Sequence, residues 1–298
     1  MPWYFFAFLT PAFYSINNIV DKFLLEKRIK DPFTLTALSG FVTGLIGVIL
    51  GFFTGFQQIG VLQISLLVFS GVLLIFYLIP YFEAIKFDDA SRVIPLFQFI
   101  PVFTYILSAV FLKEALSAKQ VFGLVLVVGA GILISIKKIE GSIFFPRKSF
   151  WLMILSSFMY GSIAVLFRFV SRDTNFWAAV SYQYIGTGLG GVLLILFPRV
   201  RHGFAVRLIE IKKSIRVIVI SHSLGLLAQL SESIAVTMVA VPLVHIIWSI
   251  QPVIVLILGT LLTVWFPHII KEDIKKAVVA HKLVSVALMF CGLFLVYF

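Results

Sequence analysis

The stretch VLQISLLVFSGVLLIFYLIPYFEAIKFDDASRVIPLFQFIPVFTYILSAVFL (residues 61–112) contains two long apolar runs separated by a short charged turn. Each run has about the 17–25 residues that a helix needs to cross the hydrocarbon core of a bilayer. In the turn, Asp88, Asp89 and Arg92 are expected to be solvated, whereas Glu83 lies about one turn deeper. The stretch therefore predicts two membrane-spanning helices joined at the membrane surface, with one acidic group inside the apolar region.

The composition of the whole chain agrees with this local pattern. Of its 298 residues, 61% are apolar and 12% are charged, and the mean hydropathy is +1.09. Soluble domains have about 45–50% apolar and about 25% charged residues. An aqueous globule could not bury this much apolar surface, so we expect an all-α integral membrane protein.

Charge and cysteine content exclude several other classes. The net charge of +11 comes from basic residues in short loops between apolar segments, where they act as orientation signals. A nucleic-acid partner is therefore not expected. The single cysteine, Cys291, excludes a disulfide framework and a multi-cysteine metal cluster. We expect no metal, no cofactor and no catalytic residues.

Ten apolar windows are long enough to be membrane helices, and none shows the short alternating pattern of a barrel strand. They cover approximately Trp3–Phe23, Phe33–Phe53, Val61–Phe82, Val93–Leu112, Val121–Ile136, Phe150–Phe167, Phe176–Phe197, Val217–Ala235, Val241–Phe266 and Leu283–Phe298.

The second half of the chain repeats the first. FVTGLIGVIL (41–50) aligns with YIGTGLGGVLLIL (184–196), and FEAI (82–85) aligns with SESI (231–234), which pairs Glu83 with Glu232. Because five helices are an odd number, the second copy enters the membrane from the opposite face. The sequence predicts ten transmembrane helices as two inverted five-helix repeats, in residues 1–138 and 149–298, with a linker at 139–148.

The basic residues predict an orientation. Odd-numbered loops and their flanks hold 20 of the 24 Lys and Arg residues, and the other face has only Lys113, Lys119, Arg168 and Arg172. By the positive-inside rule the odd-numbered loops are cytoplasmic. We expect a multi-pass protein of the cell (inner) membrane with both termini outside.

Residues 83–135 resemble the EamA domain of the drug/metabolite transporter superfamily, and the resemblance extends over nearly the whole chain, including its duplication. The resemblance rests on Ala84 and Lys86 before the loop, on Pro101-Val102-Phe103 in the next helix, and on Glu114 after it. Gly123, Gly129 and Gly131 in the following helix fit the same pattern. The resemblance implies a ten-helix transporter fold. It does not select a substrate, because the family moves amino acids, sugars, nucleotide derivatives and drugs.

Ionisable groups at membrane depth are costly, so each is a functional candidate. Lys22 and Glu83 lie at the predicted inner mouth, and Arg168 and Glu232 at the outer mouth. One hypothesis is that Lys22–Glu83 and Arg168–Glu232 are gate contacts that form in alternation. The other is that these side chains only reach the headgroups or fix loops.

Further polar and aromatic residues within the windows are candidates for a substrate cavity, although such groups often serve only as hydrogen bonds between helices. His245 can carry a proton near neutral pH, and with Glu232 it could form a proton relay. The cavity candidates are Tyr14, Asn17, Tyr81, Gln98, Tyr160, Gln229, His245 and Trp248.

These features favour a secondary transporter that moves a small polar or amphipathic metabolite, amino-acid-like, sugar or drug-like, by alternating access. Protons are a candidate coupling ion, and a monomer and a homodimer both fit. One alternative is a lipid-carrier flippase, which would need a polar groove open to lipid. A membrane-embedded enzyme is the other, but the sequence has no HExxH or GxSxG motif.

Overall fold

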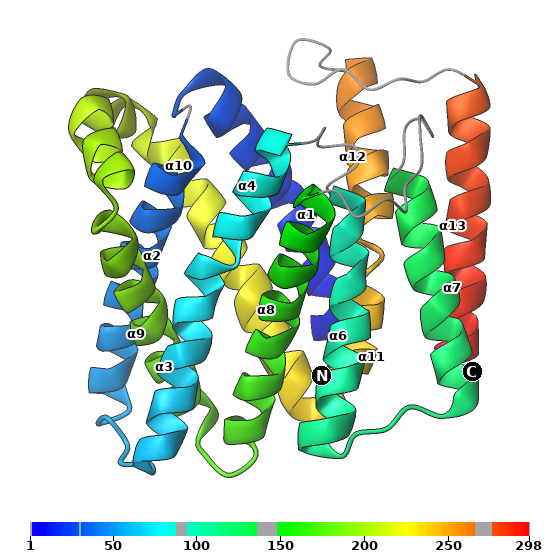
Figure 1. Ribbon diagram of the computed structural model, residues 1–298, viewed down its shortest axis with the longest axis horizontal. Helices are drawn as coiled ribbons and strands as arrows, with labels where there is room; N and C mark the ends of the chain where they lie inside the picture. The colour runs from blue at the N-terminus through cyan, green and yellow to red at the C-terminus, as the bar shows by residue number, and fades with distance from the viewer. Residues whose placement is uncertain (1, 30, 88–93, 136–147, 266–275, 298) are drawn as a thin grey trace.

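The computed structural model describes residues 2–29, 31–87, 94–135, 148–265 and 276–297, and every regular element among them is a helix (Figure 1). The helices are α1 (Trp3–Lys27), α2 (Pro32–Phe53), α3 (Val61–Phe76), α4 (Leu78–Phe87), η1 (Ile94–Phe99), α6 (Ile100–Leu107), η2 (Ser108–Leu112), α7 (Ala118–Ser135), α8 (Lys148–Ser171), α9 (Phe176–Ile195), α10 (Pro198–Met238), α11 (Val241–Trp248), α12 (Gln251–Trp265) and α13 (Lys276–Tyr297).

Several of these helices can cross a membrane by length and composition. Within the described residues, six apolar stretches are long enough: Pro32–Phe53, Val61–Ala84, Lys148–Ser171, Phe176–Ile195, Pro198–Met238 and Val241–Leu261. Shorter apolar helices cover Leu96–Leu112, Ala118–Leu133 and Val284–Tyr297. Large apolar side chains such as Phe52, Phe53 and Phe294 are exposed on the outside of the bundle, as expected for a protein whose solvent is lipid. The chain is an integral helical membrane protein.

Two predicted helices are interrupted. The window from Val61 divides into α3 and α4 at Tyr77, and the window from Val241 divides into α11 and α12 around Ser249 and Ile250. Pro80 and Pro252 follow these breaks, and a proline cannot supply the backbone N–H of a continuous helix.

The basic segment around residues 198–216 corrects a sequence-based prediction. It was expected to be a loop, but it is the first half of α10, which continues without a break to Met238. Pro198 at the first helical position fits the start of a helix, and the following Arg, Leu, Ile, Glu and Lys residues are compatible with helix. In Figure 1, α10 crosses the molecule diagonally.

Helices α2, α3 and α9 pack through glycines. A Cβ on Gly44 would lie 2.5 Å from the Cα of Gly188, and a Cβ on Gly40 would lie 2.9 Å from the Cα of Gly191. The backbones are therefore in direct contact, as small residues permit between membrane helices. We call this contact the glycine layer: Gly40, Gly44, Gly47, Gly71, Gly186, Gly188 and Gly191.

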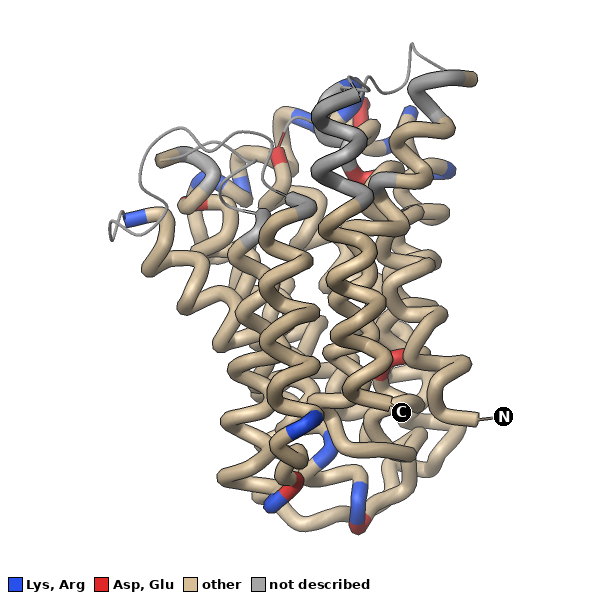
Figure 2. The backbone as a smooth tube through the Cα atoms, turned by 90° about the vertical axis from the view of Figure 1, so that its right-hand side faces the viewer, with Lys and Arg blue, Asp and Glu red and all other residues tan. Residues whose placement is uncertain are grey.

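The remaining helices form a second group beside the glycine layer. α1 packs along α10, α8 packs against α3, α4 and α6, and α7 pairs with α13 at the edge of the molecule (Figure 1). The chain termini lie near one end, and Lys and Arg positions lie mainly toward the two ends of the bundle (Figure 2). The polar groups considered next lie where α1, α6, α8, α10 and α11 meet.

Candidate functional site

A buried acid and a buried imidazole face each other at the centre of this junction. Glu232 of α10 is 8% exposed and His245 of α11 is fully buried. His245 Nε2 lies 2.8 Å from Glu232 Oε1. The two residues are adjacent because α10 ends at Met238 and α11 begins at Val241, which folds the chain back on itself.

Thr104 of α6 contacts the other nitrogen of the imidazole. Its hydroxyl lies 2.9 Å from the carbonyl oxygen of Ile100, and its oxygen lies 2.6 Å from His245 Nδ1. Both imidazole nitrogens therefore have a hydrogen-bond partner, Thr104 on one side and Glu232 on the other. The geometry thus provides a buried chain of hydrogen bonds from Thr104 through His245 to Glu232.

Aromatic side chains cover the other side of the carboxyl group. The Tyr160 hydroxyl donates to Glu232 Oε2 at 3.1 Å and lies 3.4 Å from the Tyr14 hydroxyl. The Trp248 ring stacks on Tyr160, with centroids 5.2 Å apart and planes within 2°. Tyr77 meets Tyr160 edge to face at 5.0 Å. Tyr14, Tyr77 and Trp248 are only partly buried, so these rings lie between the Glu232–His245 contact and more accessible space.

Of the predicted cavity residues, the structure brings Tyr14, Tyr160, His245 and Trp248 together around Glu232. Gln229 lies one helical turn before Glu232 on α10, and its Nε2 has no hydrogen-bond partner among the described atoms. The same holds for Trp248 Nε1.

Three other cavity candidates lie apart from this cluster. Tyr81 contacts Phe97, with ring centroids 5.0 Å apart. Gln98 is buried against Gly131 of α7, and its Oε1 has no partner among the described atoms. Asn17 belongs to a hydrogen-bonded group between α1 and α10, described next.

Asn17, Asp21 and Ser221 connect α1 to α10. Asn17 Nδ2 donates to Asp21 Oδ2 at 2.9 Å, and the Ser221 hydroxyl contacts Asn17 Oδ1 at 3.1 Å and also Asp21 Oδ1. This arrangement satisfies polar groups between two helices.

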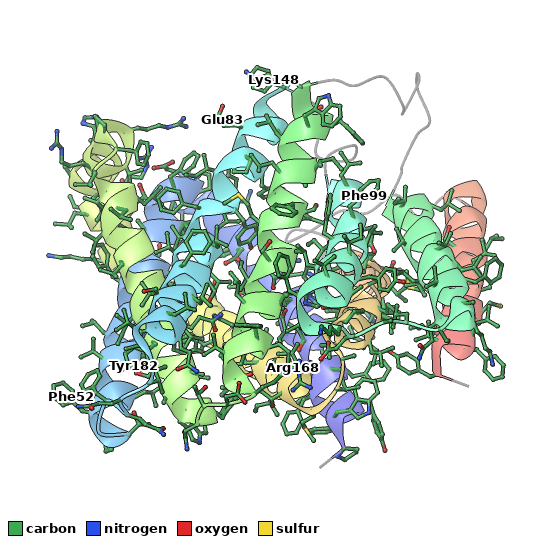
Figure 3. All side chains as sticks on the ribbon, turned by 60° about the horizontal axis from the view of Figure 1, so that its bottom comes forward. Phe52, Glu83, Phe99, Lys148, Arg168 and Tyr182 are labelled. Carbon is green, nitrogen blue, oxygen red and sulfur yellow. The ribbon has the colours of Figure 1, made fainter. Side chains whose placement is uncertain are left out.

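The predicted gate residues lie at opposite ends of the bundle. Figure 3 shows Glu83 near Lys148 at one end and Arg168 toward the other. Glu83 is partly buried on α4, and the Lys22 side chain lies outside the described part of the structure. Arg168 and Glu232 are both described, but the contact expected between them is not made here. Arg168 Nε instead lies 3.3 Å from Glu114 Oε1, and Glu232 pairs with His245.

The sequence did not single out Thr104, Tyr77, Asp21 or Arg172. Glu114 entered only as part of the family pattern. Asp21, which is partly buried and precedes Lys22, could have been noted as an ionisable group in an apolar window. The role of Thr104 depends on a contact with a residue 141 positions away, which no local pattern shows.

The fold and the buried hydrogen-bonded cluster define a multi-pass helical membrane protein whose centre is polar. In a comparison with protein families, residues 1–136 match the EamA-like transporter family, which confirms the predicted resemblance over slightly less than half of the chain. This match is consistent with an EamA-domain protein of the drug/metabolite transporter superfamily and indicates a membrane transporter.

The fold also resembles known structures. Among 28 matching chains is a solved structure titled "Crystal structure of protein", with a TM-score of 0.69 and 17% sequence identity. The alignment covers 98% of this chain and 95% of that one. At this identity the similarity concerns the fold alone. No curated protein matches the chain.

Proposed function

We propose that the protein is a secondary transporter that moves a small polar or amphipathic metabolite by alternating access and couples this movement to protons through Glu232 and His245. The observation that carries the proposal is the buried hydrogen-bonded cluster where helices from both halves of the chain meet. Thr104 comes from the first half, and Tyr160, Glu232 and His245 come from the second. A site shared by two halves can change its surroundings when the halves rock against each other.

The proposed architecture is two inverted five-helix repeats, residues 1–138 and 149–298, with a linker at 139–148 of which only Lys148 is described. The glycine layer supports it. Gly44 contacts Gly188, its equivalent in the predicted alignment, and Gly40 contacts Gly191 while Gly47 contacts Tyr184. Reciprocal contacts of this kind are typical of a two-fold axis. In Figure 1, α1 and α8, the first helices of the two halves, run in opposite directions.

The proposed location is the cell (inner) membrane, with the odd-numbered loops in the cytoplasm and both termini outside. The support is the distribution of charge. In the sequence, 20 of the 24 Lys and Arg residues belong to the odd-numbered loops and their flanks, and the described Lys and Arg positions lie mainly toward the two ends of the bundle (Figure 2). This asymmetry is what the positive-inside rule uses.

The flippase alternative predicts a polar groove open to lipid. A shallow depression lies on the outer face of α1, but it is lined mainly by apolar side chains. These are Pro2, Tyr4, Phe5, Phe8, Leu9 and Ala12. The buried polar cluster therefore favours a transporter with an internal site.

The test of coupling is transport into proteoliposomes with a panel of amino acids, sugars and organic cations, with and without an imposed pH gradient. We expect flux of a transported compound to depend on pH, and Glu232→Gln to lose most of this dependence. Tyr160 bonds Glu232, and Tyr14 and Tyr77 contact Tyr160, so these three residues must be intact in all variants. Glu210→Gln is the matched control, because Glu210 lies on the same helix but is exposed. Flux that ignores pH and is unchanged in Glu232→Gln and Glu83→Gln would refute proton coupling.

The inner gate proposal, Lys22 with Glu83, has a separate test. Each single charge reversal should lower transport, and exchange of the two residues should restore it in part. If the exchanged protein stays as inactive as the worse single variant, the pairing is wrong.

A further inference from the structure

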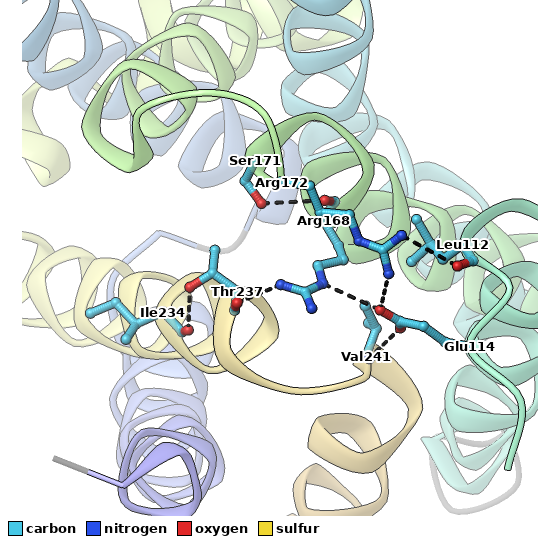
Figure 4. Close-up of polar contacts among 8 residues, drawn as sticks. All are labelled: Leu112, Glu114, Arg168, Ser171, Arg172, Ile234, Thr237 and Val241. Carbon is cyan, nitrogen blue, oxygen red and sulfur yellow. Dashed lines mark hydrogen bonds and ion pairs between the residues drawn. The ribbon is translucent and has the colours of Figure 1, made fainter.

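Away from the central site, one carboxylate binds three donors from two different elements (Figure 4). Glu114 Oε1 accepts from Arg168 Nε at 3.3 Å and from Arg172 Nη2. Its other oxygen, Oε2, accepts from the backbone N–H of Val241 at 3.1 Å. We call Glu114, Arg168 and Arg172 the Glu114 clasp.

The arginines of the clasp also bind helix ends. Arg168 Nη1 donates to the carbonyl oxygen of Thr237 in the last turn of α10, and Arg172 Nη1 donates to that of Leu112 at 3.3 Å. The last carbonyl groups of a helix lack partners within it and carry partial negative charge, so a guanidinium is favourable there. Val241 is the first residue of α11, where the N–H groups favour a carboxylate. The clasp therefore ties α8, η2, α10 and α11 together with charges that match the helix ends.

The side chains of the clasp are partly shielded from solvent, which strengthens their hydrogen bonds. The exposed side-chain fractions are 11% for Glu114 and 16% for Arg168, against 37% for Arg172. Hydrogen bonds between charged groups are stronger than neutral ones, and the effect grows as water is excluded. Loss of the Glu114 charge would leave two guanidinium groups facing each other without an anion.

The clasp and the Glu232–His245 contact both involve the turn between α10 and α11. Arg168 binds α10 five residues after Glu232, and Glu114 binds α11 four residues before His245. At a rise of 1.5 Å per residue along a rigid helix, the contact of Arg168 with α10 lies within about 8 Å of Glu232. The contact of Glu114 with α11 lies within about 8 Å of His245. A change in the clasp that moves these helix ends is therefore expected to alter the contact between Glu232 and His245.

We infer that the Glu114 clasp is the gate at this end of the transporter, and that Glu114 is a positioning residue which holds Glu232 against His245 while the gate is closed. This inference rests on the proposed function. It replaces Glu232 by Glu114 as the acid that Arg168 binds in the closed gate. Release of the clasp then allows the turn between α10 and α11 to move. Gate opening is thereby linked to the contact between Glu232 and His245.

The test measures gate opening directly. Cys291, the one native cysteine, is replaced by Ser, and Ser108→Cys is introduced as a reporter. Ser108 is fully buried, its hydroxyl has no partner among the described atoms, and its backbone oxygen accepts the N–H of Glu114 at 3.1 Å. The rate of modification by a charged, membrane-impermeant methanethiosulfonate reports how often the clasp opens.

We expect Glu114→Gln to raise the modification rate about tenfold or more, because a charge-assisted hydrogen bond is lost. Glu232→Gln should also raise the modification rate. The double variant, Glu114→Gln with Glu232→Gln, should show an increase smaller than the product of the two single effects, because both changes weaken contacts at the turn between α10 and α11. Arg168→Lys keeps the charge but loses the Nε donor, and it should give a smaller increase. The control is Lys119→Gln, which removes the charge of an exposed lysine in the first turn of α7.

Three results would count against the inference. An unchanged rate in Glu114→Gln and Arg168→Lys would make the clasp a static structural contact. A faster rate in Glu114→Gln with no effect of Glu232→Gln, or with multiplicative effects in the double variant, would remove the positioning role. If Glu114→Gln is not recovered folded, Glu114→Asp and Arg168→Lys decide the same question. Because modification needs no substrate, failure of transport would leave this result intact and would count only against the proposed function.

Discussion

The glycine layer and the Glu232 site are two interfaces in one bundle, built from different kinds of contact. In the glycine layer, backbone touches backbone, and no side chain can rotate to relieve a shift. At the Glu232 site, helices meet through side chains that have alternative rotamers and alternative partners. The difference teaches which part of the bundle can rearrange: we expect movement at the polar interface while the glycine layer stays closed.

The most damaging change should be in the glycine layer. A Cβ on Gly71 of α3 would overlap the backbone oxygen of Gln183 in α9, which no side-chain movement can relieve. We expect Gly71→Val to lower the free energy of unfolding by roughly 3 kcal/mol or more, or to prevent folding. Thermal unfolding in detergent, followed by tryptophan fluorescence, measures this. Gly129→Ala is the matched control, because nothing lies within 4 Å of its added Cβ. Equal effects in both variants would disprove the rigid contact.

A smaller loss is expected from the centre of the polar site. His245→Phe leaves Glu232 and Thr104 without their imidazole partner, and a buried group without its hydrogen bond costs about 1–3 kcal/mol. We also expect transport to lose its response to pH. The comparison variant is His222→Phe, since His222 makes a longer contact of 3.4 Å with Thr43 and is less buried. If His222→Phe is the more harmful change, His245 is not the central group.

The Thr104 hydroxyl should contribute about 1 kcal/mol, typical of a hydrogen bond between membrane helices. Thr104→Val keeps the shape and removes the hydroxyl that contacts His245 Nδ1, so the imidazole loses one of its two partners. We expect a small drop in unfolding temperature together with a shifted pH profile of transport. Ser162→Ala is the control, because that hydroxyl bonds only its own helix. A shift in stability with an unchanged pH profile would limit Thr104 to packing.

The smallest effect should come from the ring stack. Trp248→Phe retains an aromatic ring but reduces its overlap with Tyr160, and such pairs are worth about 0.5–1.5 kcal/mol. A double-mutant cycle of Trp248→Phe with Tyr160→Phe measures the coupling energy. A coupling energy of zero would show that the contact between the two rings does not stabilise the protein.

The sequence predicted the class of fold because hydrophobic length is a local property. Most apolar windows correspond to helices, and the repeat predicted that Gly44 and Gly188 are equivalent before their contact was known. The basic start of α10 was not predicted as helix, because its charges resemble those of a membrane-surface loop. Its many straight-chain residues were the available signal.

The candidate site was predicted in part. Glu232 and His245 stand out in sequence because ionisable residues are rare in apolar helices, and they do meet. The partner of Arg168 could not be predicted. Arg168 lies in the last turn of α8, and its side chain reaches Thr237 and Glu114 near other helix ends, while Glu232 lies more than a turn deeper. Which of two acids an arginine reaches depends on packing that spacing alone does not give.

Helix α10 has one more consequence. Its 41 residues without a break amount to about 60 Å at 1.5 Å per residue, roughly twice the thickness of the hydrocarbon core. Even when tilted, such a rod extends beyond the acyl chains, and its first half carries the cationic groups Arg199, Arg201, Arg207, Lys212, Lys213 and Arg216. A pull on these groups by anionic headgroups would therefore act on the same continuous helix that carries Glu232.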